Sequence, residues 1–332
     1  AFAEMTPREI VQATLDFANP PRVARSFAPS DIVFTSCDTL AQITPWTQID
    51  EHRWQRVDIW GNVWQRVDAT SMGEVVKGAL DYLTQLWDYT LPNLIDPEGY
   101  RPVQRQREAH PDSWLIGALP GFTFNIARKM RRLECYLMDL LVERDLIRHL
   151  HDRIDDLLEA MIVNYASAGV DAIMAPEDWG TQRTTLISPR LWFQEFYPRF
   201  ERLFAAAHAH GLRVFMHSCG QMEAIVPGLI KAGVDVLQFD QPDLHGIDTL
   251  ATHQQTSKIT FWCPVDIQTT LQTRDCEVIQ AKAREMLDKL WRGRGGFIAG
   301  YYSDNRSIGL DPQWQHCACE AFLKYGVRER YR

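Results

Sequence analysis

The sequence has few cysteines, no long apolar run and no excess of positive charge. Its seven cysteines among 332 residues are odd in number and scattered, which predicts no disulfide framework and favours a reducing, cytoplasmic compartment. No uninterrupted apolar run approaches the roughly 18 residues that a membrane span needs, and we expect no secretory signal. The net charge of -8 gives no basis for nucleic-acid binding.

The remaining composition is that of an ordinary globular protein. Apolar residues make up 45% and charged residues 23% of the chain. The length suits one large α/β barrel or two ordinary domains. Eleven tryptophans is a high count, and several lie close together near the front of the chain.

Short apolar segments alternate with helical patterns in the second half of the chain. The expected strands cover residues 172–176, 212–217, 234–239, 258–262 and 297–300. Strands that alternate with helices of 10 to 18 residues predict a parallel sheet. With one or two weaker repeats earlier, they predict a single (β/α)8 TIM barrel spanning residues 1–332, with an N-terminal extension. A doubly wound open sheet is the alternative, but no glycine-rich nucleotide loop follows any strand.

Helices are expected between and before these strands. Thr6, Pro7 and Glu9 form a helix start of the capping-box type. Cys317 and Cys319 cannot share one helical face, so both are interpreted as packing residues. The main expected helices cover residues 6–17, 122–141, 144–168, 188–210, 274–290 and 312–325.

Residues 40–110 form an aromatic-rich insertion that we expect to cover the barrel mouth. Gly61 and Asn62 stand between Trp60 and Trp64, which predicts a hairpin. One interpretation of this block is a small apolar cluster over one end of the barrel. The other is the wall of a pocket for a flat ligand.

His217 and Cys219 end the expected strand 212–217 and are the first metal-ligand candidates. Residues i and i+2 of a strand point the same way, so the imidazole and the thiol can converge on one point, and zinc accepts both. Gly220 allows a sharp turn afterwards. The alternative is a half-buried histidine beside a buried thiol.

Polar residues gather just past the carboxyl ends of the other expected strands, where barrel enzymes keep their sites. Cys263 is a third metal candidate, although it suits a buried small side chain as well. Asp240 is interpreted either as a metal ligand or as the first residue of an Asx turn. Glu177 is interpreted either as a ligand or substrate-contacting residue or as the partner of Arg183 or Arg213 in an ion pair. The members of these groups are Glu177, Asp178, Trp179, Gln182, Asp240, Gln241, Cys263, Asp266, Tyr301, Tyr302 and Asp304.

Several of these segments together resemble the uroporphyrinogen decarboxylase superfamily, whose fold is a (β/α)8 barrel. The resemblance runs from about Thr6 to Tyr325 and is greatest to the corrinoid-dependent methyltransferase branch. The segments that carry it are Val57-Asp-Ile-Trp-Gly-Asn-Val-Trp64, Gly169-Val-Asp-Ala172, Glu177-Asp-Trp-Gly-Thr-Gln182, His217-Ser-Cys-Gly220, Gly233-Val-Asp-Val236 and Val265-Asp-Ile-Gln268.

The sequence departs from that superfamily in two places. Uroporphyrinogen decarboxylases have an early Arg-Gln-Ala-Gly-Arg core that binds substrate carboxylates, whereas this chain has Arg22-Val-Ala-Arg-Ser-Phe-Ala-Pro29. This argues against porphyrinogen decarboxylation. The methyltransferase branch has a second cysteine after the last strand, whereas the only suitable cysteine here is Cys263, one strand earlier.

The resemblance implies a zinc enzyme that passes a methyl group from a methyl ether, most simply a methoxylated aromatic compound, to the cobalamin (corrinoid) cobalt of a partner protein. It implies His217, Cys219 and Cys263 as zinc ligands. Glu177, Asp178 and Asp240 are the catalytic candidates. The substrate-binding candidates are Trp60, Trp179, Gln182, Gln241, Tyr301 and Tyr302.

Other functions fit parts of the same pattern. Within the methyltransferase branch, the chain could instead methylate a thiol from methylcobalamin. A metal-independent, decarboxylase-like lyase would use Asp and Arg side chains, and a non-catalytic binder would hold a ligand or a corrinoid protein without turnover. Zinc content separates the lyase from the methyltransferases, and turnover separates the binder from both.

Overall fold

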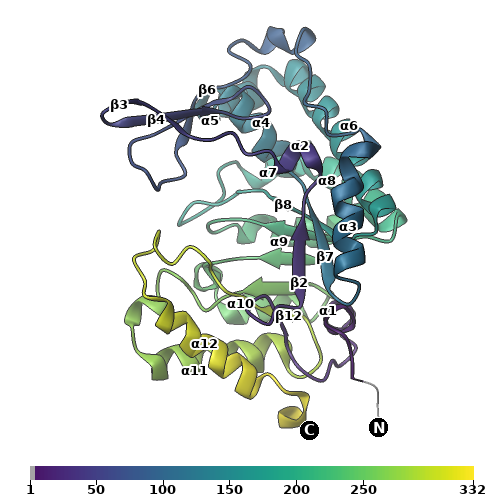
Figure 1. The fold of residues 1–332 in the computed structure, drawn as a ribbon, viewed down its shortest axis with the longest axis vertical. Helices are drawn as coiled ribbons and strands as arrows, with labels where there is room; N and C mark the ends of the chain where they lie inside the picture. The colour runs from purple at the N-terminus through teal and green to yellow at the C-terminus, as the bar shows by residue number, and fades with distance from the viewer. Residues whose placement is uncertain (1–3) are drawn as a thin grey trace.

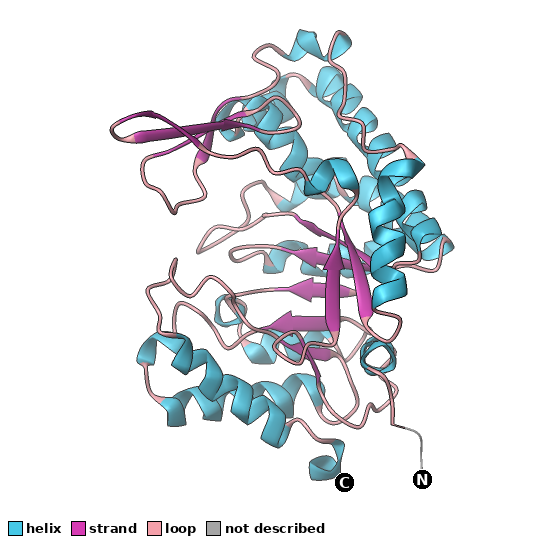
Figure 2. Cartoon of the chain, in the orientation of Figure 1, coloured by secondary structure: helices cyan, strands magenta, loops and turns pink. Residues whose placement is uncertain are grey.

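The computed structural model describes residues 4–332. Eight parallel strands form a nearly closed barrel with helices around it, as Figures 1 and 2 show. The predicted (β/α)8 barrel is therefore confirmed. In barrel order the strands are β1 (Ala24–Arg25), β12 (Phe297–Ala299), β11 (Thr260–Cys263), β10 (Val236–Gln238), β9 (Arg213–His217), β8 (Ala172–Pro176), β7 (Trp114–Ala118) and β2 (Ile32–Thr35).

The barrel is interrupted between β1 and β2, which are neighbours in the chain and form the two ends of the sheet. A six-residue connection joins these strands, too short for the helix that a parallel crossover needs. Asp31 holds this connection: its carboxylate accepts from Arg22 at 2.6 and 2.8 Å and from the backbone N–H of Arg25 at 2.9 Å.

Helices follow most strands and cover the outside of the barrel. The first one is capped as expected, because Thr6 accepts from the backbone N–H of Glu9 and Glu9 accepts from that of Thr6. The α-helices are α1 (Pro7–Leu15), α2 (Asp38–Ala41), α3 (Arg101–Ala109), α4 (Thr123–Arg131), α5 (Leu133–Val142), α6 (Arg144–Ala168), α7 (Pro189–Glu195), α8 (Tyr197–Ala209), α9 (Val226–Ala232), α10 (Ile247–His253), α11 (Cys276–Met286) and α12 (Pro312–Tyr325).

Two expected long helices are each divided in two. The helix expected over 122–141 breaks at Arg132, whose backbone has φ 63°, a left-handed conformation that ends α4 before α5 begins. The helix expected over 188–210 breaks between α7 and α8, where Pro198 occupies the first turn of α8.

The insertion between β2 and β7 forms its own four-stranded antiparallel sheet. Arg56 pairs with Trp64, and the turn between them contains Gly61 and Asn62, so the expected hairpin is confirmed. Figure 1 shows this sheet projecting from the barrel beside α4 and α5. Its strands are β3 (Thr47–Asp50), β4 (Arg53–Val57), β5 (Val63–Arg66) and β6 (Glu74–Lys77).

Side chains of the barrel strands alternate between the barrel interior and the surrounding helices. Large apolar residues fill the interior, among them Trp114, Phe215 and Trp262. The residues between them pack outward against the helices in a second, larger core. This alternation decides which residues at the strand ends can reach the mouth.

Cys276 and Cys317 form a disulfide between α11 and α12, with a Cα–Cα distance of 5.6 Å. The expectation of no disulfide was therefore wrong, and so was the interpretation of Cys317 as a packing residue alone. Residues 41 positions apart meet because the two helices lie side by side (Figure 1). With this pair present, cysteine usage no longer argues for one compartment.

A buried ionic network joins the outer helices behind β8. Arg199 of α8 contacts Asp152 at 2.8 Å and the fully buried Asp155 at 2.9 Å, both on α6. It also contacts Glu195 of α7 at 3.0 Å, and Thr123 donates to Asp155 at 2.5 Å. Within residues 4–332, no helix has both the length and the apolarity required to cross a membrane.

Candidate metal and active site

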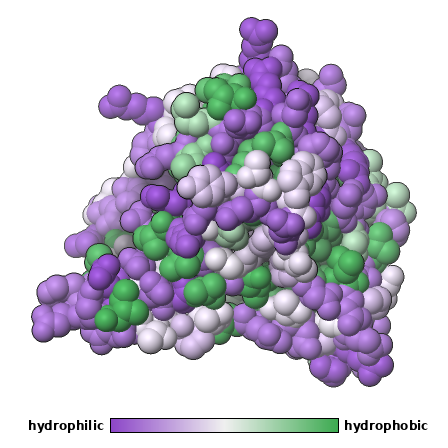
Figure 3. All heavy atoms as spheres, turned by 90° about the horizontal axis from the view of Figure 1, so that it is seen from above, coloured by the Kyte–Doolittle hydropathy of each residue, from purple (hydrophilic) through white to green (hydrophobic). Residues whose placement is uncertain are grey.

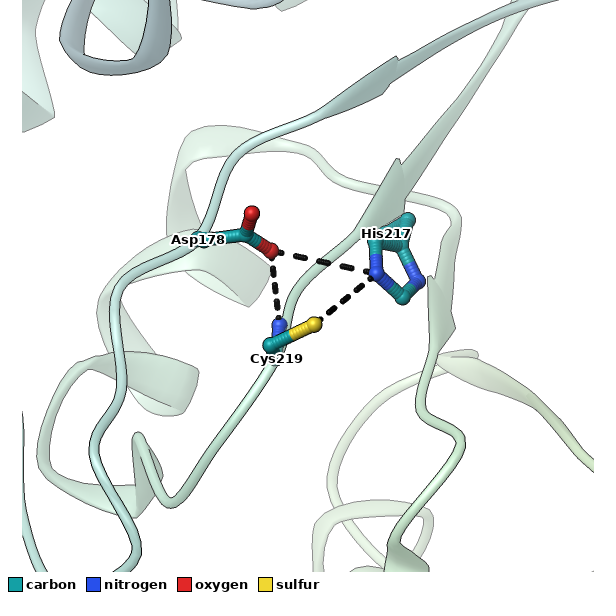
Figure 4. Close-up of side chains that lie close together, drawn as sticks. All are labelled: Asp178, His217 and Cys219. Carbon is teal, nitrogen blue, oxygen red and sulfur yellow. Dashed lines mark hydrogen bonds and ion pairs between the residues drawn. The ribbon is translucent and has the colours of Figure 1, made fainter. Parts of the chain in front are cut away.

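Asp178, His217 and Cys219 lie together just past the carboxyl ends of β8 and β9, and Figure 4 shows their side chains turned toward one another. One ligand atom of each lies within 4.8 Å of the other two. The Nε2 of His217 is 3.3 Å from the Cys219 Sγ and 3.8 Å from the Asp178 Oδ1. We call these three residues the metal-ligand group.

Two glycines let the loops that carry this group approach each other. A Cβ on Gly180 would lie 2.6 Å from the backbone of Gly220, and Gly220 has φ 78°. Backbone hydrogen bonds close the contact, from Gly180 to the Cys219 carbonyl at 3.1 Å and from Gln221 to the Thr181 carbonyl at 2.6 Å. The loop after β8 therefore holds Asp178 against Cys219, whose N–H donates to the Asp178 Oδ1 at 3.0 Å.

The ring of His217 is oriented from behind by Gln238. The side-chain amide of Gln238 donates to the Asp240 Oδ1 at 2.9 Å, so its carbonyl oxygen faces the Nδ1 of His217 and accepts from it. Because Nδ1 then carries the proton, Nε2 presents its lone pair to the metal-ligand group. This is the usual arrangement behind a metal-binding histidine.

In the absence of a bound cation, the surroundings of Cys219 favour the protonated thiol over the thiolate. Partial desolvation by the surrounding loops and the carboxylate of Asp178 raise the pKa of the Cys219 thiol to about 12, although the residue is exposed at the mouth. A bound cation reverses this preference, because a thiol that coordinates a metal ion is deprotonated. Nitrogen, sulfur and oxygen donors at these distances fit zinc better than magnesium or calcium.

Glu177 and Trp179 were expected in the site, but both turn away from the mouth. Glu177 is fully buried, and its carboxylate accepts from the backbone N–H groups of Phe124 and Asn125 at 3.1 and 2.7 Å. It therefore caps the start of α4, and burial raises its pKa to about 8. Trp179 is also fully buried, with its ring stacked 4.2 Å from that of Phe124. Their predicted roles stay predictions, and Asp178 between them is the residue that lies with His217 and Cys219.

Cys263 does not lie with His217 and Cys219. Its neighbour Trp262 fills the barrel interior, so alternation along β11 turns Cys263 outward into the helix-side core, where it is fully buried. Burial raises the pKa of its thiol well above the ordinary value. Asp178 takes the third place in the group instead, and Asp240 contacts Gln238 behind it.

Aromatic residues inside the barrel mouth were missed in the sequence. Gln238 pairs in register with both His217 and Trp262, so these three inward-facing residues form one row across three strands. Phe34 of β2 stacks on Trp262 with ring centroids 6.0 Å apart, and 53% of Phe34 is exposed. Gln238 could have been found in the sequence, because it is a polar residue inside the apolar run Val236–Phe239. No local sequence pattern marks Phe34 as a residue of the mouth.

The other predicted substrate residues lie around the mouth without contacting the metal-ligand group. Trp60 is mostly buried in the wall of a cavity beside the insertion. Gln182 is exposed on the loop after β8, and Gln241 is half-buried after Asp240. Tyr301 and Tyr302 are half-buried in the loop after β12, where their hydroxyls contact Asn305 at 3.2 Å and Ser307 at 3.3 Å. Their roles stay predictions.

A cluster of one carboxylate and two histidines supports the loop that carries Cys219. Glu223 lies 3.2 Å from the Nδ1 of His245 and 2.5 Å from the Nε2 of His253. The other nitrogen of His245 is 3.3 Å from the carbonyl oxygen of Gly220. Burial alone would raise the pKa of Glu223, but the two histidines outweigh it and lower this pKa to about 2.

We expect Glu223→Gln to destabilise the protein near neutral pH but not in acid. The folded pKa lies below the unfolded value of 4.5, so the stabilisation is present above pH 4.5 and is lost as pH falls toward 2. At pH 6 the variant should lose about 2 kcal/mol of unfolding free energy. Urea unfolding between pH 3 and 7 measures this difference, with the exposed Glu108→Gln as control. A loss that does not change with pH would contradict the assignment.

A (β/α)8 barrel with polar groups at the carboxyl ends of its strands has the architecture of a barrel enzyme. The family model for uroporphyrinogen decarboxylase (URO-D) matches residues 102–301, more than half of the chain. The chain therefore belongs to the uroporphyrinogen decarboxylase family.

Two solved structures are similar to this chain to different degrees. A methyltransferase from Methanosarcina mazei has a TM-score of 0.59 at 14% identity, covering 97% of this chain and 86% of that one. A D-tagatose 3-epimerase-like protein has a TM-score of 0.44 at 9% identity, covering 70% of this chain and 85% of that one. At such identities the first likeness establishes a shared fold and the second carries no argument. No curated protein matches the sequence of this chain.

Proposed function

We propose that this chain is a zinc-dependent methyltransferase, which moves a methyl group from an aromatic methyl ether to the cobalt of a corrinoid protein. The observation that carries the proposal is the convergence of Asp178, His217 and Cys219 at the barrel mouth. The family membership and the barrel shared with a methyltransferase agree with it.

Asp178, His217 and Cys219 would hold the zinc ion. A zinc ion with an open coordination position acts as a Lewis acid on an ether oxygen and so improves phenolate as a leaving group. His217 suits this role because Gln238 keeps its Nδ1 protonated. Asp178 suits it because its Oδ1 is already fixed by the N–H of Cys219.

Phe34 and Trp262 would bind and orient the aromatic ring. Phe34 is half exposed and stacks on Trp262, which lies in the same row across the sheet as His217. Aromatic rings stack on such surfaces with about 0.5–1.5 kcal/mol beyond their area burial. An apolar platform next to the metal-ligand group also excludes water from one side of the bond that breaks.

The corrinoid protein would dock over the carboxyl mouth, because the methyl carbon must be reached from the solvent side. Cys219 is exposed there and marks the accessible side of the group. In the reaction, the bond between ether oxygen and methyl carbon breaks and a bond between that carbon and cobalt(I) forms. The phenolate leaves with the electron pair and is protonated by solvent.

The test mixes purified zinc-loaded protein, a reduced corrinoid protein and 2-methoxyphenol. We expect the cobalt absorption to change and catechol to appear, and we expect His217→Ala to reduce the rate at least 100-fold, because Nε2 supplies one ligand. His210→Ala, an exposed histidine after α8, is the control. Wild-type rates in His217→Ala would contradict the metal role.

A second arm distinguishes the alternatives. Methylcobalamin with simple thiols replaces the ether and the reduced corrinoid. Product in this arm alone would identify a thiol methyltransferase, and product in neither arm would exclude both transfers for these substrates.

A further inference from the structure

A cavity of about 250 Å³ lies between the insertion and α4, and its lining includes no member of the metal-ligand group. Its walls include Trp60 and Trp64 from the insertion and Pro120 and Ile126 from the barrel side. An engineered apolar cavity of about 150 Å³ is large enough for benzene, so this cavity has room for a substituted aromatic ring. Figure 3 views the molecule from above and shows apolar patches scattered among hydrophilic side chains.

Two cations line this cavity. Arg56 comes from β4 of the insertion and Lys129 comes from α4. The guanidinium of Arg56 lies 5.0 Å from the ring centre of Trp46 and 5.2 Å from that of Trp64. The ammonium of Lys129 lies 5.4 Å from the ring centre of Trp64. The tryptophans therefore position both cations in the cavity wall.

Neither cation has a carboxylate partner among residues 4–332. The Nε of Arg56 is buried and has no hydrogen-bond partner there, which is a costly condition for a charged group. Burial and the neighbouring Arg128 lower the pKa of Lys129, and the carboxylates of Asp178, Asp58 and Glu177 offset this only in part. The terminal N–H groups of Arg56 and the ammonium of Lys129, which line the cavity, are the donors that a ligand can reach.

Asp58 is the acidic residue of the cavity wall, and its carboxylate is already engaged. It accepts from the backbone N–H groups of Trp60 and Asn62 at 2.9 and 3.0 Å. It also accepts from the Asn62 side chain at 3.0 Å and from the Trp64 indole at 2.8 Å. Two cations and one anion leave a net charge of +1 in the wall, which one monoanion neutralises.

We infer that this cavity binds a small aromatic monocarboxylate. The ring would contact the tryptophan and isoleucine walls, and the carboxylate would take the free donors of Arg56 and Lys129. A guanidinium and an ammonium in the wall of a cavity with apolar surfaces suit this ligand better than a neutral ring, which leaves both charges unpaired. The inference goes beyond the proposed methyl transfer, because the metal-ligand group takes no part in this binding.

The test measures binding of 3-methoxybenzoate by isothermal titration calorimetry, with methoxybenzene as the neutral probe. We expect saturable binding of the acid at least 10-fold tighter than that of methoxybenzene. Lys129→Met keeps the aliphatic stem and removes the charge, so it should weaken binding of the acid at least 10-fold. Lys129→Arg should restore it, and the exposed Arg105→Met should have no effect.

Two further results separate this site from the metal-ligand group. Chelator-treated protein and Cys219→Ala should bind 3-methoxybenzoate as tightly as the untreated wild type. Equal binding of both probes, unchanged binding in Lys129→Met, or no binding of the acid at millimolar concentration would each overturn the inference. None of these results depends on whether the chain transfers methyl groups.

Discussion

Cys219→Ala is expected to abolish stoichiometric zinc retention while the barrel stays folded. In the proposed zinc centre Cys219 would supply the thiolate, and its exposed side chain supports no core packing. The loss of one of three protein ligands should weaken zinc binding by at least 100-fold. Zinc content after dialysis against a weak chelator measures the effect, and circular dichroism checks the fold.

The matched variants decide which residues bind the metal. Asp178→Asn should weaken zinc binding at least 10-fold, because the amide keeps the shape and loses the charge. Cys263→Ala should keep full zinc occupancy, since Cys263 faces the helix-side core. Cys135→Ala, on the surface of α5, is the control for removal of a free thiol. Full occupancy in Cys219→Ala, or loss in Cys263→Ala, would contradict the ligand assignment.

Arg199→Leu is expected to lower the unfolding free energy by about 3–5 kcal/mol, because it leaves a buried charge without its partner. Arg199 contacts three carboxylates, and one of them, Asp155, is fully buried. Burial already raises the pKa of Asp155 even with Arg199 present. The loss should therefore be smaller at pH 5 than at pH 8, because protonation of Asp155 removes the unpaired charge.

Arg202→Leu is the matched control, one helical turn along α8. Arg202 bridges Asp156 at 2.8 Å and Glu159 at 2.6 Å, but the side chains are exposed and water screens the charges. Its removal should cost about 1 kcal/mol or less. Urea unfolding followed by tryptophan fluorescence compares both variants. Equal losses for the two would contradict the importance of burial in this network.

The barrel was predictable from the sequence because its signals are local and repeated. Apolar strands and helices alternate from Ala172 to the end, and α6 and α12 have the expected bounds. The proximity of His217 and Cys219 was predictable from their spacing, although Cys219 lies in the loop after β9 and not on the strand itself. The breaks at Arg132 and Pro198 were missed because the apolar pattern continues through them.

The sequence does not predict which way side chains point once a strand has ended, and the placement of the remaining site residues depends on that direction. Glu177 and Asp178 are adjacent acids, yet one caps α4 and the other faces Cys219. In the sequence Cys263 and Cys219 both follow apolar strands. In the structure Trp262 faces the barrel interior, so its neighbour Cys263 faces outward. Phe34 and the disulfide partners meet only through the folded chain, so no local pattern indicates them.

X-ray absorption at the zinc edge tests the central claim most directly. The proposed centre contains one sulfur ligand, from Cys219, and nitrogen or oxygen ligands from His217, Asp178 and an exchangeable position. The zinc-loaded protein should show one sulfur at about 2.3 Å and nitrogen or oxygen atoms at about 2.0–2.2 Å, and Cys263→Ala should give the same spectrum. Two sulfur ligands, one of which disappears in Cys263→Ala, would contradict the account.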